Sequence, residues 1–282
     1  MVLCSVCKKR EAVYYRRYSG EALCAKCLNN SVEKDVKKEI SKIKILNINS
    51  KIVIPITFFA PSSSIVLANM LSRIEKRFKS KIVILVPNVY NRSDIIGLLD
   101  KNDRSDIIGI KINNFNYDAL KNISLQECIR FERAWSIKAS KEIGYENIAL
   151  PITRTDISLI LVDSLLNGQR DFISETYDTL EFNGLNIFYP FASIEGETLS
   201  AYEIIAKIIV KPLCYPYIKS KSVFYSIGGN RPELDFGSEK IIQKFRSINA
   251  NRCKICGGFS SKDVCKVCKK LNLENIDIEF LS

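Results

Sequence analysis

"KIVIPITFFAPSSSIVLANMLSRIEKRFKSKIVILVPNV", residues 51–89, contains two apolar runs separated by an amphipathic pattern. The runs at 51–59 and 81–89 are rich in β-branched residues, which is typical of strands buried in a parallel sheet. Between them, one set of apolar residues recurs at helical spacing: Val66, Leu67, Met70, Leu71, Ile74 and Phe78. The stretch therefore predicts a β-α-β unit.

The same alternation of strand and helix continues along the chain. Strands are predicted near 106–112 and 146–153, and helices from about 127 to 143, 155 to 166 and 199 to 209. Such alternation predicts an α/β fold with a Rossmann-like, doubly wound, mostly parallel sheet. Sites in sheets of this kind lie at the carboxyl ends of the strands.

Composition narrows the function classes. The 282 residues include 42 Lys and Arg against 31 Asp and Glu, a formal charge of +11 that favours nucleic acid as a partner, although solubility alone would also explain it. No apolar run approaches the roughly 20 residues of a membrane span, and the N-terminus has no signal-peptide core, so we expect a cytoplasmic protein without a membrane partner. The chain has no histidine, which leaves metal binding to thiolates.

Eight of the ten cysteines form two clusters with zinc-site spacing. The first reads C-x2-C-x16-C-x2-C and the second C-x2-C-x8-C-x2-C. The members are Cys4, Cys7, Cys24 and Cys27, and then Cys253, Cys256, Cys265 and Cys268. Four protein thiolates close the coordination sphere of Zn²⁺, so we expect two structural zinc ions. Disulfides and redox pairs explain two such paired clusters in a cytosolic chain less well.

The first cluster is surrounded by basic and aromatic residues. Arg10, Arg16 and Arg17 are accompanied by Lys8 and Lys9, with tyrosines at positions 14, 15 and 18. This mixture suits phosphate contacts and base stacking in RNA. A solvated face with tyrosines packed on a small core is an equally good interpretation.

The chain divides into five parts. We predict an N-terminal zinc finger (1–30), a helical connector (31–50), an α/β domain (51–248), a C-terminal zinc ribbon (249–272) and a tail (273–282).

The two clusters and three internal stretches resemble the two-zinc-finger tRNA 2-thiolation (thiouridine synthetase) family of PP-loop ATP pyrophosphatases. The best internal piece is "ECIRFERAWSIKASKEIGYENIALPITRTDISLILVDSLLNGQ" (127–169), followed by "KPL" (211–213). The resemblance implies a PP-loop fold. Catalytic members adenylate a tRNA uridine oxygen and replace it with sulfur through cysteines and, in many, an iron–sulfur cluster.

The phosphate loop departs from the pattern of this family. The SGGxDS motif falls on Phe59, Ala60, Pro61, Ser62, Ser63 and Ser64. Its glycines let backbone N–H groups approach phosphate oxygens, whereas proline has no N–H to offer and the added side chains crowd the approach. We therefore expect no ATP at this loop, and we interpret Ser62 to Ser64 as an ordinary N-cap.

Other motifs of the family are incomplete as well. Its CxxC falls on Leu125 and Cys128, so one thiolate replaces two. Its GHxxDD falls on 151–156 and keeps only Asp156. Its third cysteine would lie near "GGNRPELD" (228–235), where there is none, and Cys214, directly after the "KPL" segment, does not match the expected position.

The resemblance and its gaps imply a non-catalytic subunit of a tRNA wobble-uridine 2-thiolation complex. Such a subunit would bind tRNA, with Arg133 as a further contact, or stabilise a catalytic PP-loop homologue in a heterodimer. A ubiquitin-like sulfur-carrier protein is a further expected partner. The expected cofactors are two structural Zn²⁺, without ATP and without an iron–sulfur cluster.

Two alternatives remain. One is an active tRNA sulfurtransferase with altered chemistry, with Cys128 as sulfur carrier, its thiolate favoured near a helix N-terminus, and Asp156 assisting. The other is a zinc-ribbon nucleic-acid-binding module unrelated to thiolation. On the helix after Cys128, Arg130 and Lys138 are interpreted as residues that are as consistent with a solvated face as with substrate contact.

Overall fold

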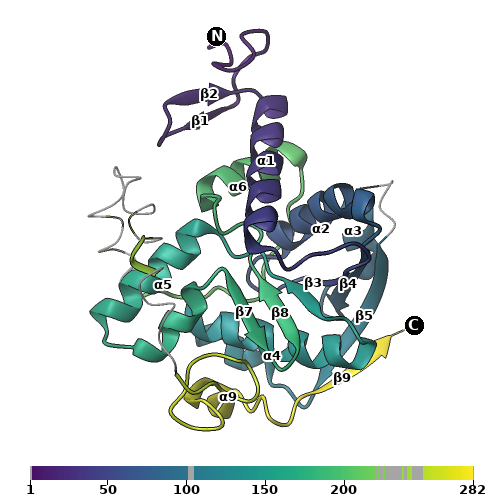
Figure 1. Ribbon diagram of the computed structural model, residues 1–282, viewed down its shortest axis with the longest axis vertical. Helices are drawn as coiled ribbons and strands as arrows, with labels where there is room; N and C mark the ends of the chain where they lie inside the picture. The colour runs from purple at the N-terminus through teal and green to yellow at the C-terminus, as the bar shows by residue number, and fades with distance from the viewer. Residues whose placement is uncertain are drawn as a thin grey trace.

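The fold is built around one seven-stranded sheet (Figure 1). The computed structural model describes residues 2–100, 105–219, 222, 225, 237, 240–242 and 250–281. The strands of the sheet are β3 (Lys51–Pro55), β4 (Lys81–Pro87), β5 (Asp106–Asn113), β6 (Asn147–Ala149), β7 (Thr179–Phe182), β8 (Leu185–Phe188) and β9 (Asp277–Leu281). Their order is β7-β8-β6-β3-β4-β5-β9. The five central strands are parallel and the two edge strands antiparallel, which confirms the predicted mostly parallel α/β sheet.

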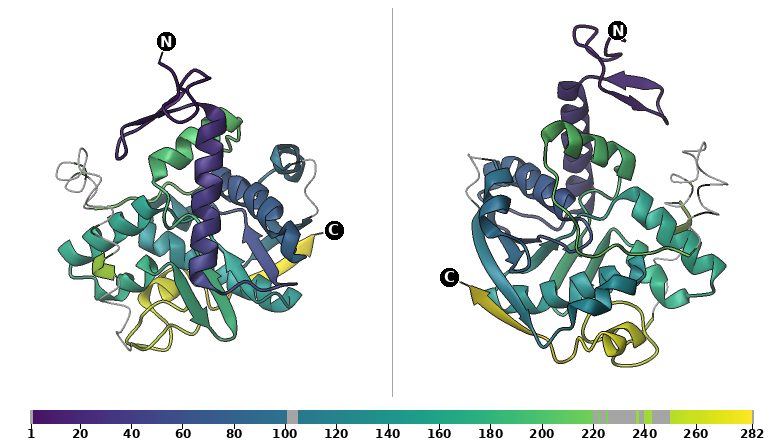
Figure 2. Two further views of the ribbon diagram at one scale, coloured as in Figure 1. Left: turned by 45° about the horizontal axis from the view of Figure 1, so that its top comes forward. Right: turned by 180° about the vertical axis from the view of Figure 1, so that it is seen from behind.

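Helices cover both faces of the sheet (Figure 2). The α-helices are α1 (Ala25–Ile43), α2 (Pro61–Glu75), α3 (Arg92–Leu98), α4 (Leu125–Ile143), α5 (Arg154–Leu166), α6 (Gly196–Ala206) and α9 (Lys266–Lys270). Short 3-10 helices are η1 (Lys76–Phe78), η2 (Tyr117–Asn122) and η3 (Arg170–Thr176). A small hairpin of β1 (Tyr14–Arg16) and β2 (Glu21–Leu23) belongs to the N-terminal finger.

The two-residue period of strand β3 decides which helices it contacts. Ile52 and Ile54 lie in a core cluster with residues of α1, α2 and α6. Val53, between them, lies in a second cluster with Phe131 and Trp135 of α4. All three strand residues are fully buried, which explains why the sequence shows a continuous apolar run rather than an alternating one.

Helix α4 has clear local signals at both ends. Ser124 and Glu127 form a capping box, and Gly144 ends the helix in the left-handed conformation at a φ of 69°. The predicted start at 127 was therefore two residues late, because Leu125 and Gln126 form the first turn. No helix in the part of the chain that the structure describes is long and apolar enough to cross a membrane.

Sequence reasoning missed helix α3 and strands β7, β8 and β9. It also predicted none of the short elements β1, β2, α9, η2 and η3, and it missed the continuity of α1 with the finger. Helix α1 begins inside the finger, at Ala25, so the predicted boundary at residue 30 falls within a helix. The two fingers lie at opposite ends of the molecule, the first beyond the end of α1 and the second beside α9 (Figures 1 and 2).

Strand β9 makes the C-terminal tail part of the sheet. It pairs with β5 over five residues, from Gly109–Leu281 to Asn113–Asp277. Ile276 and Ile278 are buried, and Lys138 forms an ion pair of 2.9 Å with Asp277. The segment 273–281 is therefore structural.

Deletion of residues 273–282 should destabilise the protein and expose the edge of β5. Burying each of the two isoleucines is worth about 1.5–3 kcal/mol, so the free energy of unfolding should fall by roughly 3 kcal/mol or more. The unpaired β5 edge should also promote self-association. Chemical denaturation and analytical ultracentrifugation test both effects, and a truncated chain as stable and monodisperse as the full one would contradict this role.

Candidate functional site

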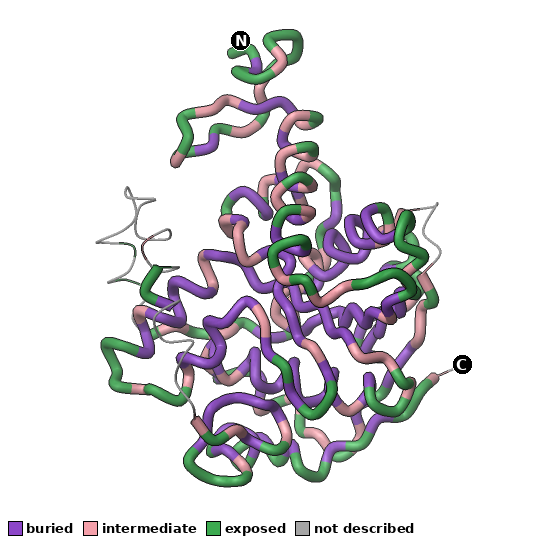
Figure 3. The backbone as a smooth tube through the Cα atoms, in the orientation of Figure 1, coloured by how far each residue is buried: buried purple, intermediate pink, exposed green. Residues whose placement is uncertain are grey.

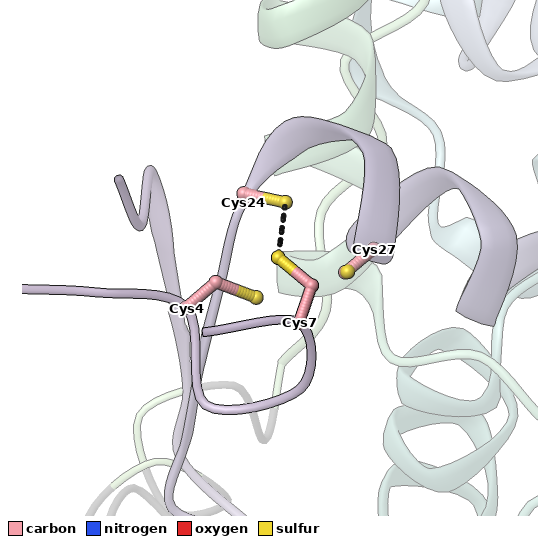
Figure 4. Close-up of side chains that lie close together, drawn as sticks. All are labelled: Cys4, Cys7, Cys24 and Cys27. Carbon is pink, nitrogen blue, oxygen red and sulfur yellow. Dashed lines mark hydrogen bonds between the residues drawn. The ribbon is translucent and has the colours of Figure 1, made fainter. Parts of the chain in front are cut away.

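The four cysteines of the N-terminal finger converge on one point (Figure 4). The Cys7 and Cys24 sulfurs are 3.8 Å apart, and all four Sγ atoms lie within 4.8 Å of one another. Zn–S bonds of about 2.3 Å in a tetrahedron place sulfurs about 3.8 Å apart, so the arrangement suits one metal ion.

The C-terminal cluster has the same geometry and is more deeply buried. Sulfur separations are 3.7 Å for Cys253 and Cys268 and 3.8 Å for Cys256 and Cys265. All four cysteines are buried, whereas two of the N-terminal four are partly exposed. The structure thus supports both predicted metal-binding clusters.

A buried ionic network attaches the C-terminal finger to α4. Arg130 and Arg133 both pair with Glu175, and Arg130 also donates to the Phe259 carbonyl of the finger. Burial opposes the charge of Arg130, but Glu175 and the Cys256 thiolate raise its pKa above the ordinary value. A Cβ on Gly258 would lie 2.9 Å from both guanidiniums, so only glycine fits there without a shift.

This network changes the interpretation of α4. Arg133 is fully buried, so the expected RNA contact of Arg133 is wrong, and its side chain holds the finger instead. Arg130 is 1% exposed and has the same role. Lys138 contacts the tail through Asp277 and the Ile276 carbonyl. The sequence offered no signal for Glu175, the residue that both arginines require.

The arginines of the N-terminal finger divide into two kinds. Arg16 is 5% exposed and binds Glu21 and Ser31, so it is structural and the expected RNA contact of Arg16 is wrong. Arg10 is exposed, and its contact with the Cys24 sulfur raises its pKa. Arg17 is 65% exposed with a 3.6 Å ion pair to Glu197. Arg10 and Arg17 therefore stay candidates for RNA contact.

The tyrosines of this finger are also of two kinds. Tyr14 hydrogen-bonds Thr198 at 3.0 Å, and Tyr18 lies under the guanidinium of Arg16. Both support the finger. Tyr15 is 60% exposed and is available for base stacking.

The degenerate phosphate loop starts helix α2, but not as predicted. Pro61 occupies the first turn and Ala60 is the N-cap, with no side-chain cap hydrogen bond. The interpretation of Ser62 to Ser64 as the N-cap is therefore wrong, because proline at the helix start places the serines inside the helix. Phe59 and Ala60 are partly buried and add side chains along the approach to the helix.

All three serine hydroxyls have internal partners. Ser62 exchanges hydrogen bonds with the backbone of Val210, and Ser64 bonds Thr57 at 3.0 Å. Ser63 donates to a carboxylate oxygen of Glu203 at 2.5 Å. The N-terminus of a helix favours a negatively charged group, and the carboxyl group of Glu203 from α6 lies there, with a pKa that burial raises and the bond from Ser63 lowers.

Phe58 fills the space behind the loop. Its ring contacts those of Tyr90, Tyr117, Phe131 and Trp135, with centroid distances of 5.3–6.3 Å. Its N–H donates to Glu132 at 2.6 Å, and its carbonyl accepts from the backbone N–H groups of Leu213 and Cys214. The side chains around Phe58 therefore fill the space at the carboxyl end of β3, the edge of the sheet where α/β folds bind ligands.

Cys128 and Cys214 lie together behind the loop. Their sulfurs are 3.1 Å apart and both residues are fully buried. From the sequence, Cys214 does not match the position of the family's third cysteine, but the fold places it beside Cys128. Burial and the neighbouring Cys214 thiol raise the pKa of Cys128, so the expected favoured thiolate is wrong.

Asp156 serves as a helix cap. Its carboxylate accepts from the Thr153 N–H at 2.9 Å and from the Thr153 hydroxyl at 2.6 Å, which starts α5. Leu125 is buried in the first turn of α4. The segment 228–235, where the family has its third cysteine, lies outside the described residues.

Comparisons with known proteins give a family-model match and matches to solved structures. Residues 3–29 match the family model described as "2-thiouridine synthetase TtuA, N-terminal LIM domain". The chain also matches the solved structure of the U34-tRNA thiolase NcsA from Methanococcus maripaludis with its [4Fe-4S] cluster, at 17% identity and a TM-score of 0.73, over 96% of this chain and 95% of that one. A search of the curated proteins gave no match.

The cofactor expectation needs correction. The exclusion of an iron–sulfur cluster is wrong, because the solved thiolase with this fold carries a [4Fe-4S] cluster. The buried thiolates of the C-terminal finger are ligands that serve zinc or an iron–sulfur cluster. The geometry supports both thiolate clusters, and metal analysis distinguishes zinc from iron in them.

Cys256→Ser should remove the metal of the C-terminal finger and, because that finger packs on α4, lower the melting temperature. Cys214→Ser is the matched control, since it removes a buried thiol outside both fingers and should leave the metal content unchanged. Mass-spectrometric metal analysis of anaerobically purified protein measures zinc and iron per chain. Unchanged metal content in Cys256→Ser would contradict the assignment.

Glu132 should make stability depend on pH. Burial raises the pKa of Glu132 to about 8, from an ordinary value of about 4.3. Between these values the folded state holds a proton that the unfolded state has released, so stability should fall by about 1.4 kcal/mol per pH unit and level off above pH 8. Denaturation at pH 5, 6.5 and 8 should show this decline in wild type and not in Glu132→Gln. Parallel curves for the two proteins would refute the role of Glu132.

The N-terminal finger and the whole-chain fold point to the same group of proteins. The match to the solved thiolase over 96% of this chain shows a shared fold. At the level of this finger and of the fold, the resemblance to the tRNA 2-thiolation PP-loop family is confirmed.

Proposed function

We propose that this chain is a non-catalytic subunit of a cytoplasmic tRNA wobble-uridine 2-thiolation complex. It binds tRNA and stabilises a catalytic PP-loop homologue, which carries out the activation and sulfur transfer. A ubiquitin-like sulfur-carrier protein is a further partner.

One observation supports this proposal above the others: internal groups occupy the loop at the start of α2. Glu203 provides the anion at the helix N-terminus, and every serine hydroxyl of the loop is already bonded within the protein. A phosphate approaching the same place would meet the negative charge of Glu203 and would have to break these bonds. The loop therefore stabilises the fold.

The exposed surface of the N-terminal finger supports the binding roles. Arg10, Arg17 and Tyr15 offer two cations and an aromatic ring to RNA. Four apolar side chains of the same finger are at least 56% exposed and suit contact with a protein partner. They are Val2, Leu3, Val6 and Val13.

Reconstitution tests the proposal. The chain alone should not thiolate a tRNA transcript, should bind that transcript at low salt, and should raise the activity of a catalytic PP-loop homologue from the same source. Arg10→Gln with Arg17→Gln should weaken tRNA binding several-fold, because two phosphate contacts are lost. Thiolation by the chain alone, or neither tRNA binding nor association with the homologue, would refute the proposal.

A second candidate function is sulfur transfer by the chain itself, with Cys128 as the sulfur carrier. The observation that favours it is the 3.1 Å approach of Cys214 to Cys128, which restores a two-thiol arrangement. Asp156 would take no part, because its carboxylate caps α5. Cys128→Ala should abolish thiolation in the assembled system under this candidate and leave it nearly unchanged under the first.

A further inference from the structure

A pocket of about 410 Å³ lies between the C-terminal end of α1 and the η1 turn, away from the phosphate loop and from both fingers. Lys37 and Lys44 line it from the α1 side and Arg77 from the η1 side. The outward side of α1 and the segment that follows it are exposed (Figure 3). The lining residues Ser41, Lys44 and Asn47 are exposed as well, so the pocket opens to solvent. Its volume falls in the range of about 300–1,000 Å³ that is usual for small ligands.

Two of the three cations are not neutralised. Lys37 forms an ion pair with Glu33 at 2.6 Å. Lys44 and Arg77 are exposed and have no ion-pair partner within the described ranges. Lys76 and Lys79 flank Arg77 and are exposed as well. The excess positive charge of the chain is thus concentrated in part at this pocket.

The opposing charges at the pocket are weak. Glu75 lines the pocket, but the residue is only 2% exposed. Its carboxyl group accepts a hydrogen bond from Ser80 and has a pKa raised by burial. The C-terminal ends of α1 and η1 carry partial negative charge, yet the C-cap residues there are Lys44 and Lys79, whose backbone N–H groups bond the carbonyls of Ile40 and Lys76 and whose side chains are positively charged. The pocket as a whole attracts anions.

The remaining lining residues suit a nucleotide better than a simple anion. Phe78 is 44% exposed, so its ring offers an apolar face at the mouth of the pocket. Ser41 and Asn47 add polar groups. Cations that hold a phosphate beside an exposed aromatic ring that stacks a base are the usual means of binding single-stranded nucleic acid.

We propose that this pocket binds one unpaired nucleotide of RNA, with its phosphate at Lys44 and Arg77 and its base against Phe78. The inference rests on the proposed function, since it locates a tRNA contact that neither finger supplies. Arg10 and Arg17 lie near the other end of α1, so the RNA backbone would run along this helix from the finger to the pocket. An acidic protein surface could also bind the cations of the pocket, but only a base gives the exposed ring of Phe78 a stacking partner.

The test uses the full chain, an unmodified tRNA transcript and fluorescence anisotropy at several salt concentrations. Lys44→Gln with Arg77→Gln should weaken binding at least threefold and reduce the magnitude of the salt slope by about one, as expected when one phosphate is no longer neutralised. Phe78→Ala should weaken binding about fivefold or more while the salt slope stays unchanged, because stacking releases no counterions.

The matched control is Lys141→Gln with Lys269→Gln, which removes the same charge from exposed positions on α4 and α9. This control should bind the transcript like wild type. Equal weakening in the control and the pocket variant would mean that net charge alone matters, and would overturn the inference.

Two further outcomes separate this inference from the proposed function. If wild type binds tRNA and the pocket variants bind it equally well, the pocket is wrong while the proposed function stands. If wild type binds no tRNA at all, both the pocket and the tRNA-binding part of the proposed function fail. Retained RNA binding with loss of the catalytic homologue in the pocket variants would assign the pocket to a protein partner and overturn the RNA assignment.

Discussion

Phe58 is the point on which the centre of this structure depends. Its N–H binds the buried carboxyl group of Glu132, its carbonyl accepts from the backbone N–H groups at 213 and 214, and its ring joins four other aromatic rings. One residue therefore connects the end of β3, helix α4 and the segment after α6. A ligand seated in the place of Phe58 would have to displace a buried ring and several hydrogen bonds, each costly to leave unmade.

The two fingers share their ligand chemistry but differ in how they are held. The N-terminal finger extends from the end of α1 and keeps exposed cations and apolar side chains, as an interaction surface does. The C-terminal finger packs on α4 through two buried guanidiniums and Glu175. Glu175 neutralises only one of the two buried arginines, Arg130 and Arg133. A divalent ion with four thiolates carries a net charge of −2 and would help to stabilise the other arginine. Loss of that metal would affect the core and not only the finger.

Sequence patterns predicted the regular elements well and the roles of single side chains poorly. Strands β3 to β6 and helices α2, α4 and α5 followed from continuous apolar runs and helical periodicity, because burial imposes those patterns directly. Strands β7 and β9 lie at the sheet edges, where polar residues alternate with apolar ones and the signal is short. The roles assigned to Arg16 and Arg133 were wrong because the sequence does not show the acidic partners that allow a charged side chain to be buried.

The sequence by itself determined the α/β class, the two thiolate clusters and the loss of the glycines from the phosphate loop, since each depends on residue type and local spacing. Only the tertiary structure decided what replaced the lost site. Contacts between residues far apart in the chain placed Glu203 beside Ser63, Cys214 beside Cys128, and Glu175 between two arginines. Such pairs leave no local periodicity in the sequence, because the sheet brings them together only when its strands have aligned.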